Sequence, residues 1–290
     1  MPVADGKSEM VPCACCVPLG LAESKQNFKL SLVCEGFSFV KCTVCGLVQR
    51  NPQPVQEEIN FRYSDAFGND YLSYELKNED AFLKLQQLAL KDAGFNKLEK
   101  ELFTCANNDK PNVLDIGCAT GALLAYLKDR QWRVTGVEIS PCAKYAREER
   151  GLDVRDIPLE KIKFPSFSFD VVLASHLIEH LNNPRSFLTE THRILKDNGF
   201  CFITTPNISG FQAKLFGAGW RSAIFDHLYL FSIKTLSKLL KRTGFKIESV
   251  HTWGGLAAGT VPKCIKKPVD FLAKHLRFGD VMIIKAKKIN

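Results

Sequence analysis

The sequence lacks any apolar run that approaches the roughly 20 residues needed for a membrane-spanning helix. Its opening stretch, MPVADGKSEM, has no apolar core of the kind found in secretion signals. Internal repeats and low-complexity tracts are also absent. From these absences we expect a cytoplasmic protein that has no membrane partner.

Net charge is close to zero over most of the chain. The 290 residues are 46% hydrophobic and 24% charged, which is typical of a soluble globular protein with one large domain and a small one. Most of the net charge of +8 arises in residues 236–290, which hold twelve Lys and Arg against three Asp and Glu. Such a segment favours an acidic partner, although a solvated helix face followed by a lysine-rich strand explains it equally well.

Cysteine is plentiful, but its pattern is not that of a disulfide framework. The eleven cysteines are an odd number, and six of them precede residue 46. Without a secretion signal, this distribution indicates reduced thiols and a local metal site. Cys13 and Cys16 form one CxxC pair, and Cys42 and Cys45 form a second.

Two CxxC pairs predict a zinc ribbon, in which four thiolates hold one structural Zn²⁺ tetrahedrally. Burial alone cannot stabilise so small a core, so the bound metal would supply its folding energy. Cys15 is an alternative ligand to Cys13 or Cys16. A degenerate ribbon that no longer binds metal is the alternative to the site itself.

The ribbon is assigned to residues 1–54. Its last residues, Asn51–Pro54, are predicted to form a stiff, extended linker. Residues 55–110 hold an aromatic-rich segment and a helix that we predict over residues 79–102. Three tyrosines of this region either form a lid over a ligand or pack against a sheet, namely Tyr63, Tyr71 and Tyr74.

The main domain, residues 111–290, is organised around residues 112–140. A first apolar strand ends at Asp115, Gly117 and Gly121 turn the chain into a helix, and a second strand ends at Glu138. This pattern is typical of a nucleotide-like ligand lying over the carboxyl ends of a parallel sheet. Glycines let the backbone approach the ligand, and the acid accepts hydrogen bonds from ribose hydroxyls.

Strands and helices alternate through this domain, which predicts a mostly parallel sheet. Helices are predicted over residues 141–150, 184–195 and 233–243, the last of them capped by Ser232. Seven strands are predicted, at residues 113–114, 134–137, 152–155, 169–175, 200–205, 245–250 and 281–287.

The form DIGCATG at residues 115–121 resembles the first motif of class I S-adenosylmethionine (SAM)-dependent methyltransferases. Together with the ribbon, SHLIEHLNNP and DHLYLFS, it is similar to a bacterial subgroup of small-molecule methyltransferases with an N-terminal zinc ribbon. The resemblance implies an α/β, Rossmann-like fold with a seven-stranded, mostly parallel sheet. It also implies a substrate cap at about residues 206–232.

The resemblance assigns the cofactor residues one by one. The loop of Asp115, Gly117, Cys118 and Gly121 would contact the methionine part of SAM. The remaining assignments are Glu138 to the ribose, Ile139 to the adenine face, Asp156 and Ile157 to the adenine edge, and Ser175 and His176 to the place where methyl group and acceptor meet. For each acid the alternative is a role as a helix-capping or solvent-exposed residue, and this alternative has more weight for Asp156 than for Glu138.

The run His176 to His180 has the HxxEH pattern of zinc peptidases, in which two histidines of a long helix bind metal. Here it follows a buried strand directly and is closed by Asn182-Asn183-Pro184, which disfavours a peptidase. The positions also resemble the ExxEH of ubiquinone-pathway O-methyltransferases, where carboxylates and histidine hold Mg²⁺. His176 departs from that pattern, which places Mg²⁺ dependence in doubt.

We expect SAM-dependent O- or C-methylation of a small metabolite, such as a sugar nucleotide or a biosynthetic intermediate. A hydroxyl or carbon acid needs a base, for which His180 and His227 are the candidates. An RNA methyltransferase is the first alternative, but residues 1–54 carry only five Lys and Arg against four Asp and Glu. The second alternative is a non-catalytic scaffold that binds SAM.

Overall fold

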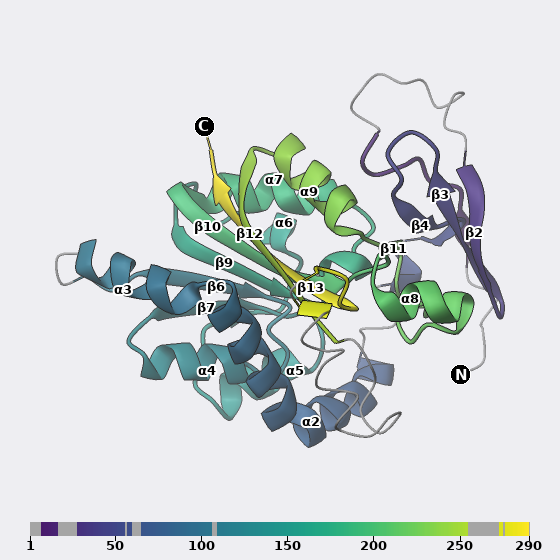
Figure 1. Ribbon diagram of the computed structural model, residues 1–290. Coiled ribbons are helices and arrows are strands. Elements are labelled where there is room, and N and C mark those ends of the chain that lie inside the picture. Colours follow the sequence, from purple (N-terminus) through teal and green to yellow (C-terminus); the bar gives the residue numbers. More distant parts are fainter. Residues whose placement is uncertain are drawn as a thin grey trace, which may run out of the picture.

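The computed structural model describes residues 7–16, 28–55, 57–59, 65–105, 109–254, 273–274 and 276–289. Within them, a large sheet lies between two layers of helices, and a smaller sheet stands at one end of it (Figure 1). Tyr63, one of the three tyrosines considered for a lid, lies outside the described residues.

The large sheet has the predicted seven strands, in the order β12-β13-β10-β9-β6-β7-β8. The strand β13 is antiparallel to both of its neighbours, and the other pairs are parallel. The predicted fold class is therefore confirmed. The strands are β6 Asn112–Ile116, β7 Arg133–Val137, β8 Val154–Arg155, β9 Phe169–Ser175, β10 Leu195–Pro206, β12 Phe245–Trp253 and β13 Val281–Lys288.

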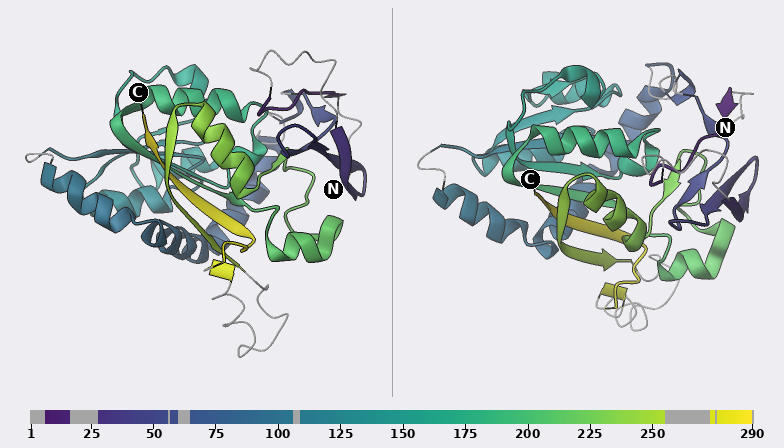
Figure 2. Two further views of the ribbon diagram at one scale, coloured as in Figure 1. Left: turned by 45° about the horizontal axis from the view of Figure 1, so that its top comes forward. Right: turned by 90° about the horizontal axis from the view of Figure 1, so that it is seen from above.

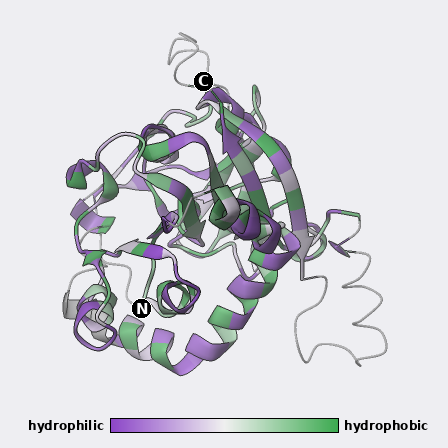
Figure 3. Ribbon diagram, turned by 90° about the vertical axis from the view of Figure 1, so that its left-hand side faces the viewer, coloured by the Kyte–Doolittle hydropathy of each residue, from purple (hydrophilic) through white to green (hydrophobic). Residues whose placement is uncertain are grey.

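Alternate residues of each central strand face opposite helix layers, so both faces of the sheet are buried. In β6, Leu114 and Ile116 join the core on one face, whereas Val113 joins the core on the other. Three helices cover the face with Leu114 and Ile116, namely α6 Leu159–Ile162, α7 Pro184–Ile194 and α9 Ile233–Arg242 (Figure 1). Four helices lie on the other face, namely α2 Asp65–Asp92, α3 Phe95–Cys105, α4 Ala122–Asp129 and α5 Cys142–Glu148. Figure 3 shows hydrophilic and hydrophobic residues alternating along the outer helices.

Two helix predictions need correction. The helix expected over residues 79–102 is two helices, α2 and α3, because the chain turns at Gly94 with φ +81°. The helix α7 ends at Ile194, one residue before the predicted end, and Asn198-Gly199 lies inside β10, next to a register shift against β9. The Ser232 cap of α9 is confirmed, since its hydroxyl accepts a hydrogen bond from the Thr235 amide at 3.1 Å.

The smaller sheet has four antiparallel strands in the order β11-β4-β3-β2. Three belong to the predicted ribbon, and the fourth comes from the predicted cap. They are β2 Phe28–Cys34, β3 Phe37–Cys42, β4 Val48–Arg50 and β11 Tyr229–Leu230. Figure 2 shows this sheet beside the end of the main sheet in two further views. The remainder of the cap forms α8 Phe211–Phe216 and the short helix η4 Gly217–Gly219.

The interpretation of Asn51–Pro54 as an extended linker is wrong. Asn51 and Gln53 are buried, and β5 Gln53–Pro54 pairs with β1 Ser8–Glu9. The Asn51 side chain accepts a hydrogen bond from the Val11 amide at 3.0 Å and donates one to the Val11 carbonyl at 3.2 Å. These contacts place the segment inside the ribbon, against residues 8–11, and the domain boundary at residue 54 stays a prediction.

Among the described helices, none combines the length and the apolar character needed to cross a membrane. The longest, α2, carries charged residues throughout.

Glu99 links α3 to the main sheet through a buried carboxylate. It accepts hydrogen bonds of 2.9 Å from Arg130 Nε and from the indole nitrogen of Trp132. We expect Glu99→Ala to lower the free energy of unfolding by about 1–3 kcal/mol, because the buried indole N–H loses its acceptor. Urea denaturation measures this loss.

Glu101→Ala on the same helix is the matched control. The Glu101 side chain is 59% exposed and lies 3.9 Å from Lys97, so its removal should cost less than about 0.5 kcal/mol. Equal losses in the two variants would contradict a specific role for Glu99.

Candidate functional site

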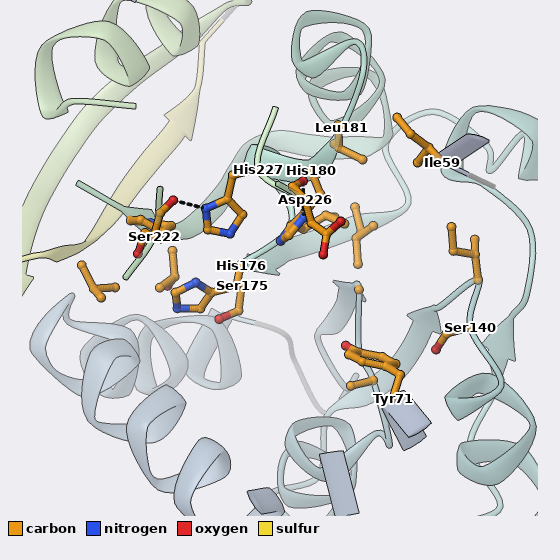
Figure 4. Close-up of a pocket in the computed structure, with 18 of the residues that line it drawn as sticks. Ile59, Tyr71, Ser140, Ser175, His176, His180, Leu181, Ser222, Asp226 and His227 are labelled. Atoms are coloured by element: carbon orange, nitrogen blue, oxygen red, sulfur yellow. Dashed lines mark hydrogen bonds between the residues drawn. The ribbon is translucent and has the colours of Figure 1, made fainter. Parts of the chain in front are cut away.

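A cavity of about 2790 Å³ opens at the carboxyl ends of the parallel strands β6, β7 and β9. The helix α2, the β2–β3 hairpin of the ribbon and the cap supply its other walls. A site for one small ligand occupies about 300–1,000 Å³, so this cavity has room for two ligands side by side. Figure 4 shows part of its lining.

The glycine turn after β6 forms as predicted. Gly117 has φ +74° and Gly121 has φ +79°, a backbone conformation that other residues rarely adopt. The Gly117 amide donates to the Val137 carbonyl at 2.8 Å, which ties the turn to β7. At Gly121, a Cβ would lie 2.6 Å from the Leu152 side chain, so glycine is needed there for packing.

Two carboxylates lie beneath this turn. Asp115 is fully buried, and its Oδ1 has no hydrogen-bond partner among the described residues. Burial, and then the negative charge of Glu138, raise the pKa of Asp115 to about 8. Glu138 lines the cavity, where its two oxygens accept from the Ala119 amide at 3.0 Å and the Ser140 amide at 2.8 Å. Each oxygen keeps a lone pair for a further donor.

The other predicted cofactor residues divide into two groups. Cys118, Ile139, Ser175 and His176 line the cavity. Asp156 and Ile157 are exposed and do not belong to its lining. The Asp156 carboxylate instead pairs with Arg147 at 3.0 Å. That contact is the solvent-exposed alternative for Asp156, so its adenine role rests on the resemblance alone.

Glu179 lies among three histidines, His176, His180 and His227. Its side chain is buried, and its oxygens accept hydrogen bonds from His176 Nδ1 at 3.2 Å and from the Thr205 hydroxyl at 2.9 Å. Burial raises its pKa, but the hydrogen bond from His176 and the charges of His176, His180 and His227 outweigh burial and hold the pKa at about 2. Glu179 is therefore an anion at neutral pH.

His180 and His227 lie together, with ring centroids 4.7 Å apart (Figure 4). His227 Nδ1 is 2.8 Å from the Ser222 carbonyl, and His180 Nδ1 is 3.0 Å from the Asp226 carbonyl. A carbonyl only accepts, so each Nδ1 carries the proton and each Nε2 keeps a free lone pair in the neutral ring. Burial lowers the pKa of His227 to about 4, which keeps this ring neutral at physiological pH.

Two groups of described side chains have ligand atoms close enough for a metal ion. In the first, the sulfurs of Cys13, Cys16, Cys42 and Cys45 all lie within 4.8 Å of one another. The Cys13–Cys45 and Cys16–Cys42 separations are 3.3 and 3.9 Å, near the ~3.8 Å that tetrahedral Zn–S bonds of about 2.3 Å require.

The residues around these sulfurs also fit a metal knuckle. The Leu47 amide donates to Cys45 Sγ at 3.4 Å after a turn at Gly46, which has φ +83°. Cys15 is not in the group, and its thiol donates to the Thr235 carbonyl of α9 at 3.9 Å. The geometry thus favours Cys13 and Cys16 over Cys15.

The second group is Glu179, His180 and His227, whose ligand atoms also lie within 4.8 Å of one another. The HxxEH run does not form the long helix of a zinc peptidase. Its last three residues make a single 3₁₀ turn, η3 Ile178–His180, and His176 has φ +52°.

Several site residues escaped the sequence analysis because they come from distant segments. Glu79 of α2 accepts hydrogen bonds of 2.5 Å from the Thr120 hydroxyl and from Arg150, so α2 is fixed over the glycine turn. Glu75, one helical turn earlier, lines the cavity, and burial raises its pKa. The spacing of Glu75 and Glu79 on one helix face was the signal that could have indicated them. Tyr71 and Tyr74, for which a lid and packing against the sheet were the two alternatives, also line the cavity.

Comparison with known proteins agrees with this geometry. A family model described as a methyltransferase domain matches residues 86–250. The ubiquinone biosynthesis O-methyltransferase of Pseudomonas aeruginosa is 34% identical over 176 residues, which cover 58% of this chain and 72% of the relative. The corresponding enzyme of Ruegeria is 30% identical over 130 residues, which cover 42% and 53%. The chain thus spans only about half the length of some curated relatives.

Solved structures share the fold at low identity. A SAM-dependent methyltransferase of Thermotoga maritima has a TM-score of 0.52 and 21% identity, over 74% of this chain and 97% of its own. A complex of the Haloferax volcanii Trm112 methyltransferase activator with a methyltransferase gives a TM-score of 0.54 and 17% identity, over 81% and 100%. With its seven-stranded sheet and the match over residues 86–250, the chain belongs to the methyltransferase domain family and has the class I methyltransferase fold.

Proposed function

We propose that the protein transfers a methyl group from SAM to a hydroxyl group of a small molecule. One observation carries the proposal: the glycine turn with Glu138 lines the same cavity as His180 and His227, whose rings lie beside the buried Glu179. The glycine turn with Glu138 is suited to a nucleoside with a charged amino-acid tail, and the two histidines are suited to an acceptor that releases a proton. The O-methyltransferase names of the similar proteins favour oxygen over carbon as the acceptor atom.

In the cofactor half, Glu138 would accept from the ribose hydroxyls with the lone pairs that Ala119 and Ser140 leave available. The amides of the glycine turn and the unpaired Oδ1 of Asp115 would hold the methionine part. Bound SAM supplies an activated methyl group on a sulfonium. The chain's part is to align donor and acceptor, which can contribute roughly 7–11 kcal/mol.

In the acceptor half, an Nε2 lone pair of His180 or His227 would take the proton from the acceptor hydroxyl. The imidazolium that forms carries a positive charge beside the anionic carboxylate of Glu179, which stabilises it. His227 is a weak base because burial lowers its pKa to about 4. This supports His180 as the first candidate.

The four-cysteine group is proposed to hold one structural Zn²⁺. Its support is the sulfur spacing and the amide hydrogen bond to Cys45. Neither an RNA substrate nor a non-catalytic scaffold has support among the similar proteins. We therefore carry only the small-molecule proposal forward.

The ribose contact is tested with Glu138. Glu138→Ala should weaken SAM binding by about 1–3 kcal/mol, because charge-assisted hydrogen bonds to the ribose are lost. Glu138→Gln keeps the shape and removes the charge, so it separates the electrostatic part. Calorimetry that gives the wild-type affinity for both variants would remove Glu138 from the site.

The base is tested with His180→Gln and His227→Gln, each of which keeps hydrogen bonding without basicity. Loss of the general base should lower kcat by about 10²–10⁴-fold and leave SAM affinity nearly intact, since only the transition state is affected. If His227 is the base, the wild-type rate should persist down to about pH 4, where its lone pair becomes protonated.

Two controls belong to this experiment. A base and a metal ligand use the same Nε2 lone pairs, so the histidine variants alone do not distinguish the two roles. Turnover is therefore measured with and without added Mg²⁺, since only a metal-ligand role makes turnover depend on Mg²⁺. If both variants retain more than about a third of wild-type turnover, the loss is far smaller than removal of a general base predicts. Alignment of donor and acceptor would then be the source of the rate.

Metal content tests the ribbon. Purified protein should contain one equivalent of zinc, and the double variant Cys42→Ser/Cys45→Ser should contain none, because two of four thiolate ligands are gone. Cys105→Ser, which removes an exposed thiol outside the group, should keep the full equivalent. Metal analysis that finds no zinc in fresh wild-type protein would refute the site.

A further inference from the structure

The ribbon and the cap share one sheet, although about 180 residues separate them along the chain. The cap strand β11 pairs with β4 of the ribbon, with Tyr229 opposite Gln49 and Leu230 opposite Val48. The ribbon sheet therefore has its edge covered by the segment that follows His227 directly.

Side chains join the same two parts through a common apolar core. Phe39 and Val48 of the ribbon pack with Trp220, Ala223 and Leu230 of the cap, and all five are buried. The cap contains only short helices and a two-residue strand, so it has little core of its own. The ribbon supplies the surface on which the cap is ordered.

Arg50, at the end of β4, is the most specific contact between them. Its guanidinium donates from Nη1 to the Phe225 carbonyl at 2.9 Å and lies 3.8 Å from the centre of the Phe225 ring. Phe37 of the β2–β3 hairpin meets that ring edge to face, with centroids 5.5 Å apart. Arg50, Phe37 and Phe225 all line the cavity.

Backbone hydrogen bonds continue from Arg50 to Glu179, which lies beside His180 and His227. The Arg50 amide donates to the Leu228 carbonyl at 2.8 Å, and the Leu228 amide donates to the Glu179 carbonyl at 2.8 Å. Leu228 follows His227, so the ribbon holds the segment that places this ring beside Glu179. The four-cysteine group, in turn, fixes the turn between β3 and β4, because Cys42 ends β3 and Cys45 precedes β4.

We propose that the ribbon is a wall of the acceptor site, and that metal on the four cysteines orders this wall while leaving the SAM half unaffected. Acceptor recognition would then depend on metal occupancy, and Arg50 would be the positioning residue that transmits it. The inference rests on the proposed function, and it assigns to the ribbon a role in binding the small acceptor.

Hydrogen exchange of the full chain tests the coupling without any acceptor. Metal is removed with phenanthroline and restored with Zn²⁺. After removal, amides of residues 227–231 should exchange at least about tenfold faster, because their partners on β4 and η3 are no longer fixed. Amides of β6, α4 and β7 should exchange within about a factor of two of their original rate, and SAM affinity should be unchanged. Unchanged exchange at 227–231, or equal loss in the SAM half, overturns the proposal.

Arg50→Met tests the clamp with the cysteines intact. The acceptor is first identified by screening small hydroxyl compounds with labelled SAM. The variant should keep one equivalent of zinc and wild-type SAM affinity, while its KM for that acceptor should rise about tenfold. The effect on kcat should be smaller, since Arg50 does not touch the reacting atoms. Arg50→Lys should rescue little, because Lys cannot reproduce the stacked, planar contact.

Arg133→Met is the matched control. Arg133 starts β7 at the opposite end of the sheet and forms an exposed pair with Asp109, so its removal should leave both affinities unchanged. An unaltered acceptor KM in Arg50→Met would overturn the proposal. Failure to bind SAM, or absence of methyl transfer in the wild type, would instead count against the proposed function, and the exchange result would still decide the coupling.

Discussion

Parallel pairing of β6 with β7 and β9 is the constraint on which the rest of the structure depends. Because parallel strands end at the same edge, the residues that follow each strand meet there, although they are far apart in sequence. Glu138 after β7 and Ser175 at the end of β9 thus reach the cavity that the glycine turn after β6 also lines. The helices on both faces bury the strands, and the cavity opens at this edge of the sheet.

Charge is distributed over this edge in two unlike ways. Asp115 is buried without a hydrogen-bond partner for one oxygen, and its raised pKa records the cost of placing a carboxylate there. Glu179 is equally buried and also accepts a hydrogen bond from Thr205, yet its pKa is low because the hydrogen bond from His176 and the charges of the surrounding histidines outweigh burial. One carboxyl group thus lacks a hydrogen-bond partner for one oxygen among the described residues, whereas the other is hydrogen-bonded through both oxygens, which suits a group that stabilises positive charge.

Local pattern predicted much of this arrangement. The seven strands, the turn at Gly117 and Gly121, the Ser232 cap and the two CxxC pairs depend on neighbouring residues, so the sequence alone could indicate them. Long-range pairing could not be predicted in this way. Nothing near Tyr229 marks it as a partner of Gln49, and Asn51 looks like a linker residue until Val11 is seen beside it. The surface contact of Asp156 with Arg147 likewise depends on how α5 packs against β8.

The missed pairings concern the acceptor side, and this has a physical reason. A cofactor shared by many proteins is held by a contiguous turn, so its residues form a compact motif. The other walls of the cavity come from segments that are far apart in sequence, among them the β2–β3 hairpin, α2 and the residues around His227. None of them has a core large enough to be ordered alone, so each depends on another segment for its surface. Recognition of the acceptor is therefore a property of the assembled fold, and a motif search could indicate the donor half of the reaction sooner than the other half.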